Sequence, residues 1–333
     1  MPIMEIGKSG IKTPRISMGT WAIGGGTWWG DNDDRESVRA IQCALDSGIR
    51  WIDTAPVYGL GHSEEVVGKA LQGRRDKAIL STKCGLQWEN SNGTFHEMIE
   101  SSPVYRDLSA KGIRRSLNES LRRLNTDYID VLYTHWQSEG PACIPIEETM
   151  GELMKMKKEG KIRAIGASNV NINHVEEYLK FGQLDVIQEK YSMLDRKAEM
   201  LLLPFCGTHN ISVQAYSPLE QGLLTGKVSA ETKLRPGDVR NNNAWWKPGS
   251  RDKVVGMLNS WKPLAEKYGC TIGNLVIAWT VMRSDGINVL CGARKTEQVR
   301  ENVKAGLLQL DKADYERMLK DSDEVICQCK KDN

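Results

Sequence analysis

Short apolar runs recur along this chain of 333 residues, and a stretch with helical spacing follows nearly every one of them. The runs cover residues 16–19, 49–52, 78–83, 129–135, 164–168, 186–189, 212–216 and 287–290. Apolar runs of this length are typical of parallel strands that are buried on both faces. Parallel strands need helical crossovers, and eight strand–helix units predict a closed (β/α)8 TIM barrel. We expect residues 1–333 to form this barrel as a single domain.

Turn residues and missing periodicity define the segments outside the barrel units. Residues 4–6 and 11–13 flank a Gly-Lys-Ser-Gly turn, which predicts a β-hairpin before the first barrel strand. Residues 84–106 and 217–251 show no clear periodicity, so we expect two long loops at the face where the strands end. The polar tail, residues 325–333, is expected to be loose.

Three of the apolar runs each lead into one ionisable residue. These are Asp53, Lys83 and His135, and Tyr58 follows Asp53 in a segment rich in turn residues. Charges that close apolar strands are costly unless they are paired, so we expect these side chains to meet. Lys83 would lower the pKa of Tyr58 below its usual ~10, and the tyrosine could then protonate a carbonyl oxygen. The alternative is a turn aspartate, a packed tyrosine and a buried structural histidine.

Composition narrows the class of protein. The formal net charge is +2 and the basic residues are dispersed, so neither nucleic acid nor a membrane surface is predicted as a partner. The eight cysteines form no CxxC pair, so no metal site is predicted. No signal peptide or membrane-spanning run is evident, and reduced cysteines in the cytoplasm are the simplest interpretation.

An ordered set of motifs along the chain resembles the aldo-keto reductase family, most closely the bacterial branch related to voltage-gated potassium channel β subunits. The matching segments are Gly19-Thr20-Trp21, Asp53-Thr54-Ala55-Pro56-Val57-Tyr58-Gly59, Ser81-Thr82-Lys83, Asp130-Val131, His135-Trp136, Gly166-Ala167-Ser168-Asn169, Gln188, Ala215-Tyr216-Ser217-Pro218-Leu219, Gly222-Leu223-Leu224-Thr225-Gly226-Lys227, Gly292-Ala293-Arg294 and Glu301-Asn302. The resemblance implies that the hairpin plugs the N-terminal end of the barrel. It also implies catalysis by Asp53, Tyr58, Lys83 and His135, with Tyr58 as proton donor.

The resemblance implies NADP as cofactor, held by residues from several strand ends. Ser168, Asn169 and Gln188 would bind the carboxamide, Tyr216 would stack on the nicotinamide, and Glu301 and Asn302 would meet the adenine. The other implied contacts are Thr20, Trp21, Asp53, Ser217, Leu219, Gln221, Gly222, Leu223, Gly226, Lys227, Gly292, Ala293, Arg294, Thr296 and Gln298. Gly24-Gly25-Gly26 lacks the GxGxxG spacing, so a Rossmann site is not predicted.

The preference for NADP depends on few residues. Many family members have lysine-serine where this chain has Gly292-Ala293, and arginine where it has Gln298. Arg294, with Lys295 beside it, still favours NADP, and NAD stays open.

Tryptophans are unusually common, with ten against three phenylalanines. Besides Trp21, six lie in segments that follow strands, where the loops of a barrel meet. They are Trp28, Trp29, Trp88, Trp136, Trp245 and Trp246. Indoles can pack on a sugar ring, so these residues favour a polyhydroxylated or cyclic carbonyl substrate, with plain loop packing as the alternative.

The sequence therefore predicts an NADP-dependent oxidoreductase that reduces an aldehyde or ketone, with a sugar-derived carbonyl compound as one candidate substrate. One alternative is a cofactor-binding regulatory or channel-associated subunit with incidental turnover. A metal-dependent barrel hydrolase is disfavoured, because the strand ends lack clustered histidines and carboxylates. The expected partner is a small molecule, and the sequence leaves open whether the chain forms a homo-oligomer.

Overall fold

Eight parallel strands close into a barrel in the computed structural model of the chain, which describes residues 1–140 and 143–331. In chain order they are β3 (Ile16–Gly19), β4 (Trp51–Asp53), β5 (Ile79–Cys84), β9 (Ile129–Thr134), β10 (Ile162–Ser168), β11 (Val186–Lys190), β12 (Ser212–Tyr216) and β13 (Ile287–Gly292). Pairing of β13 with β3, with Val289 opposite Ile16, closes the ring. The predicted (β/α)8 barrel is confirmed, and each predicted apolar run overlaps one of these strands.

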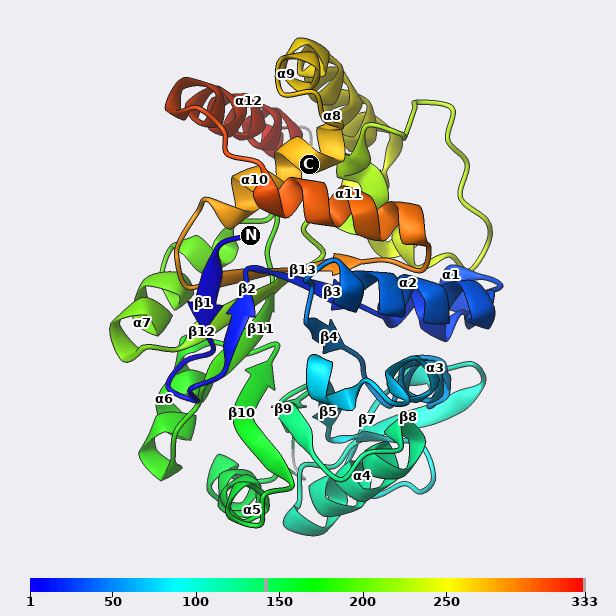
Figure 1. Cartoon of the computed structure of the whole chain (residues 1–333), viewed down its shortest axis with the longest axis vertical. Helices are drawn as coiled ribbons and strands as arrows, with labels where there is room; N and C mark the ends of the chain where they lie inside the picture. The colour runs from blue at the N-terminus through cyan, green and yellow to red at the C-terminus, as the bar shows by residue number, and fades with distance from the viewer. Residues whose placement is uncertain (141–142, 332–333) are drawn as a thin grey trace.

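Helices surround the barrel and connect its strands (Figure 1). They are α2 (Asp34–Asp46), α3 (His62–Leu71), α4 (Ala110–Leu124), α5 (Ile146–Lys158), α6 (Ile172–Phe181), α7 (Leu202–His209), α10 (Ile272–Val281) and α11 (Thr296–Leu307). The amphipathic pattern of α4 buries Ile113 and Leu117 against the sheet, and Ser109 caps its first turn by accepting from the amide of Gly112.

The predicted N-terminal hairpin consists of β1 (Ile3–Glu5) and β2 (Lys12–Pro14), with Met4 opposite Thr13. Ile6 and Ile11, between these strands, are buried in one cluster with Trp51 and Val131, which lie on barrel strands β4 and β9. The hairpin therefore covers one end of the barrel interior, and Figure 1 shows it in front of the strands.

Segments expected to be long loops contain short elements. Residues 84–106 include a three-stranded antiparallel sheet of β6 (Leu86–Gln87), β7 (Thr94–Ile99) and β8 (Ser102–Arg106), in the order β6-β8-β7. The sequence did not predict this sheet, because a β-bulge between Phe95 and Glu97 breaks the alternation of β7. The remaining short elements are η1 (Trp21–Gly24), α1 (Gly26–Trp29), η2 (Arg75–Lys77), η3 (Lys197–Glu199), η4 (Glu220–Thr225), η5 (Val239–Asn242) and η6 (Ala244–Trp246).

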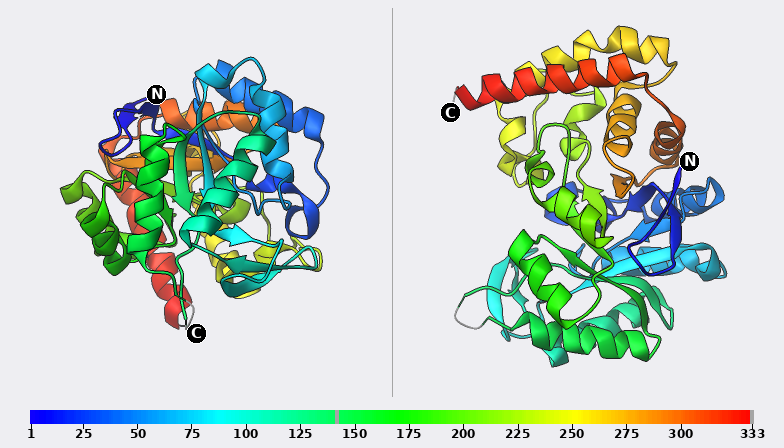
Figure 2. Two further views of the ribbon diagram at one scale, coloured as in Figure 1. Left: turned by 90° about the horizontal axis from the view of Figure 1, so that it is seen from below. Right: turned by 90° about the vertical axis from the view of Figure 1, so that its left-hand side faces the viewer.

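A second apolar core lies outside the barrel, between α8 (Pro248–Ser260), α9 (Lys262–Lys267), α10 and α12 (Lys312–Lys331). Figure 2 shows α12 lying along α8 and α9 at one end of the molecule. The loose tail expected over residues 325–333 is wrong for its first seven positions, because Val325 and Cys329 are buried in this core as part of α12. The last two residues, 332–333, lie outside the described residues.

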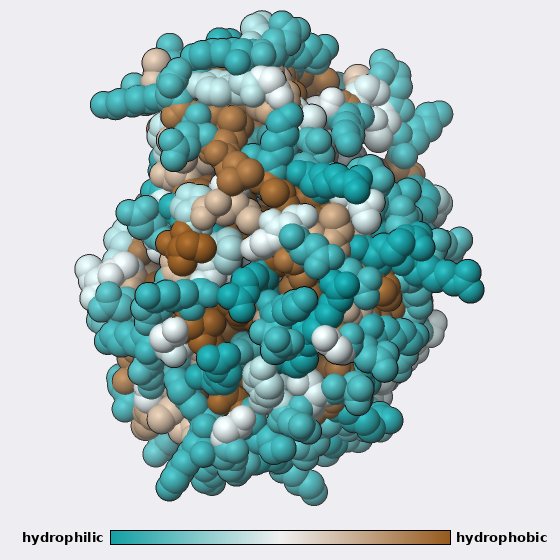
Figure 3. Space-filling model, viewed as in Figure 1, coloured by the Kyte–Doolittle hydropathy of each residue, from teal (hydrophilic) through white to brown (hydrophobic). Residues whose placement is uncertain are grey.

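The surface is largely hydrophilic on the face that Figure 3 shows, with small apolar patches, the most extended of them near α10, α11 and α12. Within the described ranges, no helix is long and apolar enough to cross a membrane. No disulfide bond joins the cysteines of these ranges either.

If α12 is an integral part of the fold, Val325→Ala should lower the free energy of unfolding by about 1–3 kcal/mol, because it removes buried methyl groups and leaves a cavity. Gln328→Ala, an exposed position in the same helix, should change it little. Denaturant unfolding curves of both variants test this. Equal stability of the two variants would contradict the packing of α12.

Candidate active site

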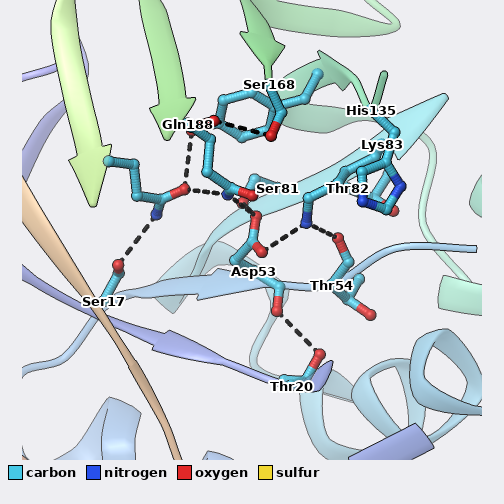
Figure 4. Close-up of polar contacts among 12 residues, drawn as sticks. Ser17, Thr20, Asp53, Thr54, Ser81, Thr82, Lys83, His135, Ser168 and Gln188 are labelled. Atoms are coloured by element: carbon cyan, nitrogen blue, oxygen red, sulfur yellow. Dashed lines mark hydrogen bonds and ion pairs between the residues drawn. The ribbon is translucent and has the colours of Figure 1, made fainter. Parts of the chain in front are cut away.

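A buried ion pair lies at the carboxyl ends of two neighbouring strands. Asp53 ends β4 and Lys83 lies near the end of β5, and Lys83 Nζ is 2.7 Å from Asp53 Oδ2. Both side chains are at most 1% exposed. Lys83 Nζ also donates to the carbonyl oxygen of Thr54 at 2.8 Å (Figure 4). Burial lowers the pKa of Lys83, but Asp53 and Tyr58 together raise it more, so its pKa lies above the ordinary value and the side chain is an ammonium.

A chain of hydrogen bonds runs from this pair across the barrel interior. Asp53 Oδ1 accepts from Ser81 Oγ at 2.7 Å and from Gln188 Nε2 at 3.1 Å. Gln188 Nε2 also reaches Gln214 Oε1 at 2.6 Å, and Gln214 Nε2 donates to Ser17 Oγ at 3.0 Å (Figure 4). These contacts fix the carboxylate, and the carboxylate fixes the ammonium.

Tyr58 lies on this ion pair. Lys83 Nζ is 4.9 Å from the centroid of its ring, and the ring meets His135 edge to face at 5.9 Å between centroids. Burial raises the pKa of Tyr58 above its ordinary value, although Lys83 lowers it. The expectation that Lys83 brings this pKa below ~10 is therefore wrong for the protein alone, because desolvation of the phenolate outweighs the nearby cation. Tyr58 keeps its proton at neutral pH.

Two glycines set the position of Tyr58. The backbone of Gly59 passes so close to Gly24 in η1 that a Cβ on Gly59 would lie 2.4 Å from the Gly24 carbonyl oxygen. Gly59 also has a φ of +62°, in the region that favours glycine. This close approach sets Tyr58 beside Trp21, with 6.2 Å between ring centroids.

His135 follows β9 and is a neutral imidazole. Burial, and then the charge of Lys83, hold the pKa of His135 well below its usual range. Its backbone amide donates to Cys84 O, and its carbonyl accepts from Asn169 Nδ2. Nδ1 is buried and has no hydrogen-bond partner among the described residues.

The polar residues at the ends of β10, β11 and β12 contact one another. Asn169 Nδ2 donates to Ser168 Oγ at 3.2 Å, and Tyr216 OH donates to Asn169 Oδ1 at 2.9 Å. Ser168 Oγ donates to the carbonyl of Gln188. Amide and hydroxyl groups of this kind could bind a carboxamide, and the partly buried Tyr216 ring could stack on a flat ring.

The segment after β12 turns sharply, so that its backbone groups could contact a ligand. Ser217 and Gln221 have positive φ angles of 56° and 55°, Gly222 has 98°, and Gly226 has 75°. Trp246 Nε1 donates to Glu220 O at 2.9 Å, and this hydrogen bond fixes the turn against the indole. The predicted contacts Leu219, Leu223 and Lys227 lie in or next to η4, and Leu223 is fully buried.

The N-terminus of α11 follows β13 and also lies at the carboxyl ends of the barrel strands. Gln298 Oε1 accepts from the amides of Arg294 and Lys295, just before α11. Arg294 Nη1 contacts the carbonyls of Trp29 and Asp31 at 3.4 and 3.3 Å. Lys295 Nζ is 3.8 Å from Glu36 Oε2. Gly292 is exposed and Ala293 is buried ahead of this turn, and Thr296 Oγ1 donates to Glu297.

Further along α11, the Glu301 carbonyl accepts from Asn274 Nδ2 and its carboxylate accepts from Thr271 Oγ1. Asn302 Nδ2 is buried without a hydrogen-bond partner in the described part of the chain. Near β3, Thr20 Oγ1 donates to the carbonyl of Asp53.

The six loop tryptophans do not gather in one place. Trp28, Trp88 and Trp136 pack in one apolar cluster with Tyr58. Trp29 packs edge to face on Trp21 at 5.2 Å. Trp245 and Trp246 pack instead into the second core beside α8, and Trp246 is only 4% exposed.

Four residues near this face were missed by sequence reasoning. Glu189 Oε1 accepts from the amide of Val170 at 2.5 Å. Glu100 Oε1 accepts from the amide and hydroxyl of Thr27, both at 2.6 Å. The others are His96 and Arg106, which contact each other at 3.1 Å. Only the alternation of β7 and β8 could have indicated the last two, and the bulge obscures it.

Across residues 1–140 and 143–331, no group of three or more His, Cys, Asp or Glu side chains is arranged to hold a metal ion.

The barrel and this cluster define the class of protein: an α/β-barrel enzyme with buried ionisable side chains at the carboxyl ends of its strands. The chain belongs to the aldo/keto reductase family, whose family model matches residues 15–321. It is thus an oxidoreductase of a family that binds nicotinamide cofactors.

Curated relatives match nearly the whole chain. The NADH-specific methylglyoxal reductase of Escherichia coli (strain K12) is 46% identical over 94% of this chain and 96% of its own length. A probable voltage-gated potassium channel subunit beta of Arabidopsis thaliana is 31% identical over 92% of this chain and 91% of its own. The resemblance to this branch of the family is confirmed.

Solved structures similar to this chain have the same barrel fold. The glycerol dehydrogenase AKR11B4 from Gluconobacter oxydans superposes with a TM-score of 0.86 at 35% identity, covering 98% of this chain and 95% of its own. An aldo/keto reductase from Klebsiella pneumoniae in complex with NADP and acetate gives 0.70 at 28% identity, covering 94% and 92%.

The buried carboxyl group of Glu189 should make the free energy of unfolding depend on pH. Burial raises its pKa to about 7, although the amides of Val170 and Asn169 lower it. Because this pKa exceeds the unfolded value of ~4.3, the protonated carboxyl favours folding at low pH, and that contribution is lost as the pH rises to 7. Glu189→Gln should therefore gain stability relative to the unaltered protein between pH 5 and 8, by up to about 3 kcal/mol.

Unfolding free energies at several pH values measure this gain, with Glu176→Gln, an exposed carboxylate on α6, as the control. A constant difference across this pH range would contradict the raised pKa.

Proposed function

We propose that this protein reduces an aldehyde or ketone to the alcohol, with Tyr58 as the proton donor to the carbonyl oxygen. The observation that carries the proposal is the buried Tyr58 between the Lys83 ammonium and the neutral imidazole of His135. When bound, a nicotinamide cofactor supplies a hydride to the carbonyl carbon.

The residues present fit such a cofactor. Trp21, His135 and Asn302 each have a buried nitrogen without a hydrogen-bond partner in the described ranges, and all three are expected contacts of cofactor or substrate. The amides before α11 lie at a helix N-terminus after the eighth barrel strand, a favourable place for phosphate. Ser168, Asn169 and Gln188 would hold the carboxamide, and Tyr216 would support the ring.

The proton moves from Tyr58 OH to the carbonyl oxygen as negative charge develops there. Lys83 stabilises the phenolate that remains, because its ammonium lies against the ring. Asp53 keeps this ammonium in place and charged. His135 is neutral, so it can donate one N–H to the carbonyl oxygen without competing for the proton. Burial of all four groups strengthens these interactions.

We propose NADH as the preferred cofactor, which revises the NADP expected from Arg294. Both cations before α11 already have partners in the chain: Lys295 lies near Glu36, and Arg294 contacts the backbone carbonyls of Trp29 and Asp31. A carboxylate at Glu36 can accept from a ribose hydroxyl, whereas it would repel a 2′-phosphate. Among the relatives, the one at 46% identity is named NADH-specific.

The substrate is proposed to be a small carbonyl compound that carries hydroxyl groups. Trp28, Trp88 and Trp136 form an apolar wall with Tyr58, and an indole can cover the apolar face of a polyol chain. Trp245 and Trp246 are left out of this wall because they pack in the second core.

Tyr58→Phe should lower kcat for carbonyl reduction by about 10²–10⁴-fold, since general acid catalysis typically supplies this much. The affinity for NADH should stay nearly unchanged, because the ring remains. Steady-state assays together with fluorescence titration of NADH measure both quantities. Near-normal turnover of a good substrate by this variant would remove Tyr58 from the proposal.

Glu36→Gln should raise kcat/KM for NADPH by about 3–10-fold, the effect of one nearby charge in partly screened surroundings. The value for NADH should rise little or fall. Asp46→Asn is the matched control, because this carboxylate lies at the other end of α2 and pairs with Arg74 at 2.8 Å. Equal changes for both cofactors would show that Glu36 does not face the 2′ position.

A further inference from the structure

We propose that His96 is a specificity-determining residue that binds a substrate hydroxyl group next to the reacting carbonyl. The inference rests on the proposed reduction at Tyr58 and adds a residue outside the four catalytic side chains. His96 lies on β7 of the small sheet β6-β8-β7, a part of the fold that the sequence did not predict.

His96 is the extra residue of a β-bulge. Phe95 pairs with Tyr105 and Glu97 pairs with Val104, so His96 has no partner across the ladder. Bulges bend a strand and redirect a side chain, and they are common beside active sites. The His96 side chain is turned inward here, with only 9% of it exposed, although it lies on an outer strand of the small sheet.

The inward direction brings His96 to the reactive cluster. Its ring lies 5.3 Å from that of Trp136, the residue that follows His135. Trp136 belongs to the apolar cluster that contains Tyr58. His96 is therefore one side chain away from the groups that would hold the carbonyl.

Arg106 sets which nitrogen of His96 can donate. Arg106 Nε donates to His96 Nδ1 at 3.1 Å, so the proton of the neutral ring is on Nε2. Nε2 lies 3.3 Å from Glu97 Oε1, and the Glu97 side chain is 48% exposed. Since water can solvate that carboxylate, the N–H can exchange it for a substrate oxygen at small cost.

The charges around His96 favour a neutral ligand group. Arg106 Nη1 lies 2.9 Å from Glu139 Oε2, and Glu97 adds a second carboxylate. The guanidinium is also fixed over the Trp136 ring at 5.2 Å. Two carboxylates against one guanidinium leave no net positive charge for an anionic substrate. A hydroxyl group suits one N–H donor beside an indole.

The test compares two aldehydes of equal length, 2-hydroxypropanal and propanal. With His96→Ala, we expect kcat/KM for 2-hydroxypropanal to fall about 3–10-fold, the range for one hydrogen bond, mainly through KM. The value for propanal should stay unchanged. His96→Gln, which keeps an N–H donor, should recover much of the loss for the hydroxylated substrate.

His209→Ala is the matched control. This histidine stacks on Phe205 at the end of α7, before β12 begins, and so lies away from the carboxyl ends of the barrel strands. This variant should leave kcat/KM unchanged for both aldehydes. NADH binding to each variant verifies that it is folded. Equal losses for both aldehydes, or no loss for either, would overturn the role of His96 and leave the proposed reductase intact. Failure of the unaltered protein to reduce either aldehyde would overturn the proposed function, and this inference with it.

Discussion

The ion pair between Asp53 and Lys83 is the interaction on which the rest of the site depends. Two opposite charges lie in an almost solvent-free barrel end, 2.7 Å apart. Removal of either partner from such a pair leaves a buried charge and typically costs about 3–5 kcal/mol. Every remaining lone pair and proton therefore needs a partner, and Ser81, Gln188 and the Thr54 carbonyl provide them. The polar chain through the barrel is a consequence of this requirement.

The loops above the pair are held together by one segment, α1. Thr27 is bound from one side by Glu100, at the turn between β7 and β8, and from another by Arg235, which donates to its carbonyl at 2.9 Å. Arg294 reaches the carbonyl of Trp29 in the same segment. Segments that follow β3, β5, β12 and β13 thus meet at α1.

The sequence predicted the parts of this structure that follow from local chemistry. Buried parallel strands are nearly continuous apolar runs, so the barrel strands and the charges that end them were recognisable. The small sheet was missed because the His96 bulge breaks its period of two. The end of α12 was missed because its apolar residues, Val325-Ile326-Cys327 and Cys329, are few and stand between charged residues. Only the packing of α12 against α8 shows that Val325 and Cys329 are buried.

The pKa values and ionic partners of the site residues could not be predicted from residue identity alone. A lysine near a tyrosine suggested a lowered pKa, but the outcome depends on how deeply the phenol is buried, which the sequence does not specify. The same holds for Arg294, whose guanidinium is engaged by carbonyls from a loop distant in sequence. The tryptophans show a third case, since their shared position after strands did not determine which core each joins.

The most direct test of carbonyl reduction at this site is a label-transfer experiment with NADH that carries deuterium at both C4 positions. After turnover of 2-hydroxypropanal in ordinary water, mass spectrometry and NMR of the diol should find one deuterium on the former carbonyl carbon. Rapid-quench measurements should find the same product, formed far more slowly, with Tyr58→Phe. A diol without deuterium, or one formed equally fast by the variant, would contradict hydride transfer to a carbonyl that Tyr58 protonates.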